Sequence, residues 1–89
     1  MGMILEAQGA EVGKVNYRVL DVRHVPAAER SLLVLQAFEA IHSRSSFVLI
    51  TDVNPEMLHN QFDLELGDRC AWEVLQNGPE IWQVFISKR

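Results

Sequence analysis

The stretch YRVLDVRHVPAAER (residues 17–30) decides the fold of this chain. Its first six residues are rich in β-branched and aromatic side chains, which predicts a strand over residues 17–22. Pro26 has no N–H to lose in the first turn of a helix, and Glu29 suits the positive end of the helix dipole. A helix is therefore expected over residues 26–42. Its buried face, at helical spacing, should consist of Leu32, Leu35, Phe38 and Ile41.

A second strand and a second helix are expected next. The run FVLI (residues 47–50) is apolar without alternation, which is typical of a strand that is central in its sheet. Asn54 is a favourable N-cap and Pro55 fits the first helical position, so a helix is predicted over residues 55–66 and should stop at Gly67. Because β-α-β crossovers are almost always right-handed and join parallel strands, the first two strands should be parallel.

The last two strands are expected to form a hairpin around Gly78. We expect residue 74 opposite residue 82 and residue 72 opposite residue 84, with a three-residue loop over residues 77–79 that holds Gly78 in the left-handed conformation. The core face of the hairpin should carry Cys70, Trp72, Val74, Trp82, Val84 and Ile86. The order β-α-β-α-β-β predicts an α+β fold, a two-layer sandwich with a four-stranded mixed sheet and two helices on one face.

Length and composition restrict the class of protein. With 89 residues the chain forms one domain, expected over residues 17–89, after an N-terminal extension over residues 1–16 that carries a short strand over residues 3–7. The net charge of −4 argues against a nucleic-acid partner. No apolar run approaches the roughly 18 residues of a membrane span, and no export signal is visible. The single cysteine, Cys70, excludes an internal disulfide, and we expect a cytoplasmic protein.

One face of the predicted sheet is left uncovered, because two helices cover only the other face. That open face should show Leu75, Ile81 and Phe85 beside Glu73 and Gln83. An exposed apolar patch of this kind either packs under the N-terminal segment or forms an interface with a second copy or another protein. Both alternatives remain open from the sequence.

Polar side chains gather where the first two strands end. The carboxyl ends of parallel strands meet at one edge of a sheet, and the N-termini of both helices point to that edge. The candidate ligand-binding residues there are Asp21, Arg23, His24, Arg30, Asp52 and Asn54. Arginines at such a place can hold a small anionic ligand, a carboxylate or a phosphate. The alternative is that these Asp–Arg pairs only brace the loops.

No catalytic or metal centre is predicted. Neither a nucleophile with its base nor an acid–base pair in a cleft is assembled by the sequence. The two histidines that are expected to converge, His24 and His59, have no metal-ligand spacing even with Asp52 or Glu56 as a third ligand. Cys70 stands at the start of a core strand, where a buried and inert thiol is expected. The sequence names no cofactor.

Two family resemblances add to this interpretation. The run LDVRHVP (residues 20–26) resembles the opening of the TusA-like (SirA-like) sulfur carriers, in which a cysteine precedes the proline; this chain has Val25 at that place. The runs LDVRHVPAAER (20–30) and QNGPEIW (76–82) resemble the bacterial domain-of-unknown-function family DUF2249 over about residues 17–88. This resemblance implies a TusA-like fold that lacks the carrier cysteine, in a family without an established activity.

The chain departs from that family at two positions. Members tend to carry a His after the Glu-Arg pair and an Asp-His-Asp-Pro stretch after the second strand, where this chain has Ser31 and TDVNP (residues 51–55). A metal role is therefore not carried over from the resemblance.

Three functions are consistent with these observations. The first is a non-catalytic interaction module that self-associates as a homodimer or docks on a redox or metal-handling protein through its open sheet face. The second is a carrier of a small anion or cofactor at the edge where the helices begin. The third, implied by the resemblance alone, is a sulfurtransferase, for which Cys70 is the sole thiol.

Overall fold

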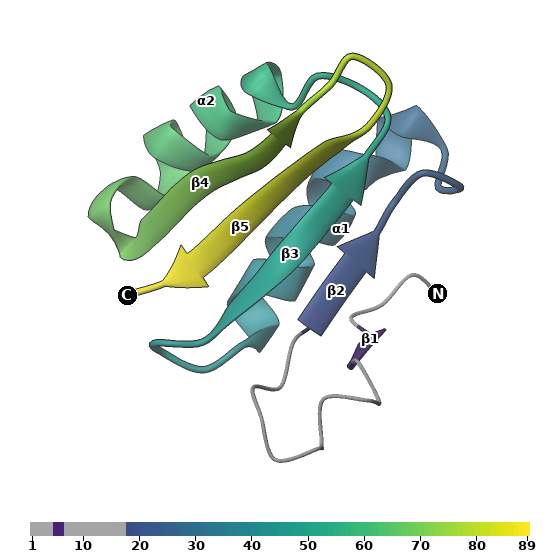
Figure 1. Ribbon diagram of the computed structural model, residues 1–89. Coiled ribbons are helices and arrows are strands. Elements are labelled where there is room, and N and C mark those ends of the chain that lie inside the picture. Colours follow the sequence, from purple (N-terminus) through teal and green to yellow (C-terminus); the bar gives the residue numbers. More distant parts are fainter. Residues whose placement is uncertain (1–4, 7–17) are drawn as a thin grey trace.

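The computed structural model describes residues 5–6 and 18–89 (Figure 1). The described residues form a five-stranded sheet in the order β1-β2-β3-β5-β4. Only β2 and β3 are parallel, and the other neighbours are antiparallel. The elements are β1 (Leu5–Glu6), β2 (Arg18–Asp21), α1 (Ala27–Ala40), β3 (Ser46–Thr51), α2 (Glu56–Leu66), the 3-10 turn η2 (Gly67–Arg69), β4 (Cys70–Asn77) and β5 (Trp82–Lys88).

The predicted α+β fold is confirmed. Figure 1 shows α1 and α2 on the same side of the sheet, and no helix of the described residues lies on its other face. β2, β3, β4 and β5 are the four expected strands, and β1 joins them at the edge beside β2. The short strand expected over residues 3–7 is thus described at Leu5–Glu6. The remainder of the extension, and the Tyr17 with which the first strand was expected to begin, lie outside the described residues.

The core lies between the helices and the sheet, and of the predicted face of α1 it includes Phe38 and Ile41 but not Leu32. Val34, Ala37, Phe38 and Ile41 are buried, whereas Leu32 is 61% exposed and Leu35 is only partly buried. The buried face of the helix thus includes Val34 and Ala37 in place of Leu32. Two residues correspond to a rotation of about 200° around a helix, so Leu32 lies on the side opposite to Val34.

The hairpin of β4 and β5 has a different register from the predicted one. Trp72 lies opposite Ile86 and Val74 opposite Val84, with a β-bulge between Val74 and Gln76. The loop is longer than expected and includes Ile81, whose carbonyl accepts a hydrogen bond from the Gly78 N–H at 3.0 Å. The slip is two residues, so the side chains keep the faces that were predicted for them.

Burial along β4 falls short of the prediction for its core face. Trp72 and Cys70 pack against the core, but Val74 is 49% exposed and Trp82 is only half-buried. The reason is that β4 is an edge strand, and α2 covers its beginning better than its end. The end of the hairpin therefore opens to solvent.

Gly78 is required by the geometry of the turn. It has φ +69°, as predicted, and a Cβ atom built on it would lie 2.6 Å from Cζ2 and 2.7 Å from Cε2 of Trp82. Both the backbone conformation and the packing of the indole ring against the turn exclude a side chain here.

Gly78→Ala should destabilise the protein more than Gly67→Ala, as measured by urea unfolding. Gly67 also has a positive φ, +55°, but its missing Cβ would meet nothing within 4 Å. Both changes strain the backbone at a cost of about 1 kcal/mol or more, and only Gly78→Ala adds the clash with Trp82. Equal losses in the two variants would show that Trp82 does not depend on the turn.

Candidate functional site

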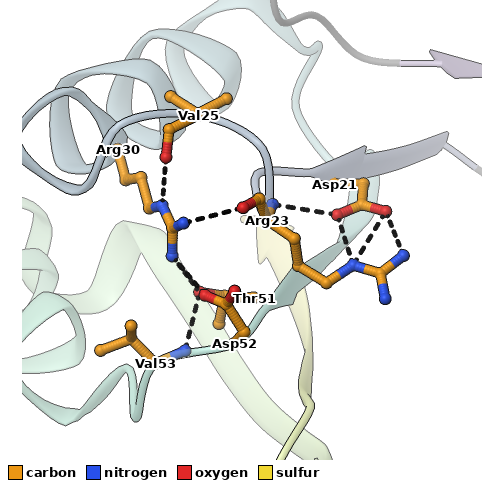
Figure 2. A network of polar contacts seen from close by, with 7 residues as sticks. All are labelled: Asp21, Arg23, Val25, Arg30, Thr51, Asp52 and Val53. Atoms are coloured by element: carbon orange, nitrogen blue, oxygen red, sulfur yellow. Dashed lines mark hydrogen bonds and ion pairs between the residues drawn. The ribbon is translucent and has the colours of Figure 1, made fainter.

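The loops that follow β2 and β3 meet at the carboxyl edge of the parallel pair. The Val22 N–H donates to the Ile50 carbonyl at 3.0 Å and continues the pairing one residue beyond β2. The β2–α1 loop and the β3–α2 loop are therefore held side by side. Four of the six predicted site residues, Asp21, Arg23, Arg30 and Asp52, take part in the polar network that Figure 2 shows there.

Arg30, in the first turns of α1, joins the two loops. Its Nε donates to the Val25 carbonyl at 2.8 Å and its Nη2 to the Arg23 carbonyl at 3.0 Å. On the other side, its Nη1 lies 2.7 Å from Oδ1 of Asp52 and 3.4 Å from Oγ1 of Thr51. The side chain is only 16% exposed. A planar guanidinium with five donors suits this arrangement of acceptors, which a lysine could not satisfy together.

Arg23 pairs with Asp21 within the first loop. Its Nε and Nη2 donate to the carboxylate at 2.9 and 2.7 Å, and the Arg23 backbone N–H adds a bond of 3.1 Å to the same group. These hydrogen bonds hold the pKa of Asp21 below its ordinary value, and those from Arg30 do the same for the pKa of Asp52. Arg23 and Arg30 are thus each paired with a carboxylate of the protein.

The other two predicted site residues lie apart from this network. Asn54 accepts a hydrogen bond on Oδ1 from the Glu56 N–H at 3.0 Å, so its side chain holds the start of α2. The helix begins one residue later than predicted, at Glu56, with Pro55 as its N-cap. His24 is exposed in the β2–α1 loop. Binding of a ligand by the six residues stays a prediction.

A cleft of about 220 Å³ lies between the starts of α1 and α2, beside the network. Its polar lining comes from Arg30, Ser31, Thr51 and Asn54, and its apolar lining includes Val22, Val34, Leu49, Val53, Met57 and Leu58. Val53 and Met57 are exposed at its rim. The sequence analysis missed most of these residues, because an apolar side chain on a helix is assigned to the core unless the packing of the two helices is known.

Titratable groups outside the network offer little chemistry. Burial raises the pKa of the Cys70 thiol, which disfavours the reactive thiolate. Its Sγ lies 3.8 Å from the Ala71 carbonyl at the start of β4. Among residues 5–6 and 18–89, no group of three or more His, Cys, Asp or Glu side chains is placed to hold a metal ion.

Comparison with known proteins identifies the family. A profile of the uncharacterised conserved proteins DUF2249 matches residues 19–88, which covers the sheet from β2 onwards and both helices. The chain belongs to the DUF2249 family. No match was found among curated proteins or among solved structures. Within the described part of this DUF2249 chain, no helix is long and apolar enough to cross a membrane.

Arg30→Lys should lower the free energy of unfolding by about 1–2 kcal/mol, because the Val25 and Arg23 carbonyls lose donors of the guanidinium while the positive charge is kept. Arg23→Lys is the matched control. The Arg23 side chain is 46% exposed and, within the described residues, bonds to Asp21 alone, so its replacement should cost clearly less. Urea unfolding of both variants checks this. A larger loss for Arg23→Lys would contradict the role given to Arg30.

The two ion pairs should also make stability depend on acid pH. The pKa values of Asp21 and Asp52 are lowered from 3.8, so their contribution is complete above the unfolded pKa and is lost as pH falls through the lower folded values. Unfolding in urea at neutral pH and near pH 3 measures this loss. In Asp52→Asn the difference between the two pH values should be smaller than in the wild type. An unchanged difference would exclude Asp52 as a source.

Proposed function

We propose that this protein is a non-catalytic binding module that associates with a second copy of itself through the open face of its sheet. The observation that carries the proposal is an apolar stripe on that face. Val19, Val48 and Phe85 lie opposite one another across β2, β3 and β5. All three are only half-buried, although they sit in the middle of the sheet.

The stripe has the properties of an interface core. The same strands turn Leu20, Leu49 and Val84 to the helices, where each is 0% exposed. On the open face, Ile50 continues the apolar surface beside Val48, and Gln83 and Ser87 flank Phe85 with uncharged groups. Sheets pack face to face about 10 Å apart with such side chains interdigitated. An uncharged apolar centre with a polar rim is the usual anatomy of a protein interface.

A second copy can cover the stripe without bringing like charges together. The stripe ends on β4 at Glu73, which lies opposite Phe85 and is exposed. A two-fold axis across the stripe places the two Glu73 carboxylates at opposite ends of the interface, so that each lies over the Val19 end of the partner. A small domain also gains from a dimer, because alone it buries a modest share of its surface.

Of the interface residues predicted from the sequence, Phe85 is central to this proposal. Leu75 lies in the bulge of β4 and is 51% exposed. Ile81 lies in the hairpin loop and is half-buried. Both belong to the margin of the proposed interface, on the side of β4, and a redox or metal-handling protein would dock on the same margin.

The two alternative functions have less support. An anion carrier at the loop edge would have to compete with Asp21 and Asp52, which already occupy Arg23 and Arg30. A TusA-like sulfurtransferase would need a reactive thiol, and burial raises the pKa of Cys70. A relationship to those sulfur carriers is part of our proposal only as an origin of the fold. We also propose that the protein is bacterial and cytoplasmic, and a single cysteine agrees with a reducing compartment.

Sedimentation velocity over a wide range of protein concentration tests the proposal. The wild type should sediment as a dimer and Phe85→Glu as a folded monomer, because a carboxylate would be buried at the centre of the interface. The control is Leu64→Glu, on an 87% exposed position of α2. It should leave the dimer intact. A wild type that is monomeric at every concentration, or a Phe85→Glu variant that stays dimeric, would overturn the proposal.

A further inference from the structure

A second cleft, of about 300 Å³, lies on the helix side of the sheet, between the start of α2 and the β4–β5 hairpin. Its lining comes from two segments that are far apart in the sequence. α2 and its approach contribute Asn54, Pro55, Glu56 and His59, and the hairpin contributes Trp72, Val74, Asn77 and Trp82. The chain has two tryptophans, and both line this cleft.

One wall of the cleft is a stack of aromatic rings. The imidazole of His59 lies parallel to the indole of Trp72, with 4.5 Å between the ring centroids and 1° between the planes. Phe62 supports Trp72 from the core in an edge-to-face contact at 5.7 Å, and Phe38 supports Phe62 in the same way at 5.9 Å. The wall is therefore connected to the core by aromatic contacts and is formed before any ligand arrives.

The opposite wall is Trp82, and the turn holds it in place. Its indole packs so closely on Gly78 that no Cβ fits between them. Val74 lies in the strand rows between Trp72 and Trp82 and is 49% exposed, so it offers an apolar floor. Two aromatic walls and an apolar floor make a place for a compact apolar group.

The charges of the cleft favour a cation. Glu56 is exposed, and within the described residues its carboxylate has no ion-pair partner. No lysine or arginine is among the lining residues. The first N–H of α2, that of Glu56, is already bonded to Asn54, and the Glu56 carboxylate lies in the first turn, so an anion at this helix start would meet a charge of its own sign. The net charge of −4 adds a field of the same sign.

We propose that this aromatic cleft binds an organic ammonium ion whose charge is surrounded by methyl groups. The methyl groups would contact Trp72, Trp82 and Val74, and the positive charge would face the indole rings and the Glu56 carboxylate. Cation–π attraction is strongest for Trp and is the usual means of binding quaternary ammonium groups. A free quaternary ammonium compound and a methylated lysine of a partner peptide share this chemistry.

Intrinsic fluorescence tests the proposal directly, since every tryptophan of the chain lines the cleft. The probe is choline, and its neutral control is 3,3-dimethylbutan-1-ol, in which carbon replaces the charged nitrogen in nearly the same shape. Choline should give a saturable change, and the alcohol should bind at least about tenfold more weakly. Equal binding of the two, or no saturable change with choline, would overturn the proposal.

Two variants locate the charge without disturbing the fold. Glu56→Gln should weaken choline binding several-fold, whereas Glu29→Gln should leave it unchanged. Both glutamates are exposed and lie in the first turn of a helix, so their effects on the helix dipole are matched. Equal effects of the two changes would show that the net charge of the protein attracts the cation, and would overturn the role given to Glu56. Trp82→Leu should abolish saturable choline binding. The indole N–H signal of Trp72 in NMR spectra reports binding in this variant.

A further titration separates the two sources of the ion. A short peptide with trimethyllysine that binds more tightly than choline, while the same peptide with unmodified lysine does not, identifies a partner side chain. Choline that binds as tightly as the peptide identifies a free compound. Either result supports the cleft, and a choline titration that does not saturate overturns it whichever peptide is used. The cleft lies on the other side of the sheet from Phe85, so Phe85→Glu should leave these titrations unchanged.

Discussion

The guanidinium of Arg30 connects the β2–α1 loop to the β3–α2 loop, and the arrangement of this edge of the sheet depends on it. The described backbone pairing between the two segments ends at Val22. Beyond it, Arg30 donates hydrogen bonds to oxygen atoms of both loops. Its hydrogen bond to Asp52 joins two residues that are 22 positions apart in the sequence. Both clefts depend on this contact. Arg30 lines the first, and the loop that Asp52 belongs to delivers Asn54 and Pro55 to the second.

The same network explains why charge is a poor guide to function here. Arginines beside helix starts suggest an anion site, yet Arg23 and Arg30 each form an ion pair with a carboxylate of the protein itself. What the molecule leaves unsatisfied is apolar and aromatic surface, on two opposite sides of one sheet. Self-association on one side and binding of a small cation on the other are compatible, since neither uses residues of the other.

The order of elements and the parallel pairing could be predicted because they follow from local signals: a proline at each helix start, Gly67 at a helix end and an unbroken apolar strand at residues 47–50. The hairpin register could not. A bulge has no signature in the sequence of β4, and the requirement that the core residues of both strands share one face is met equally by registers two residues apart. Leu32 was misplaced because α1 is apolar on more than one side, so periodicity did not fix its rotation. That the two loops lie side by side could also be predicted. Which carboxylate each arginine binds could not, because it depends on the side-chain conformations.

The bulge in β4 has a consequence for how copies of this chain can meet. β4 is the outermost strand of the sheet, and Val74 and Leu75 near its end are exposed. A regular edge of that composition invites further strands to add to it, one chain after another, without a natural end. The extra residue at Leu75 breaks the spacing of the free N–H and C=O groups at this end of the strand, which makes the edge a poorer template. Assembly is thereby directed away from open-ended growth and toward contacts that close on themselves.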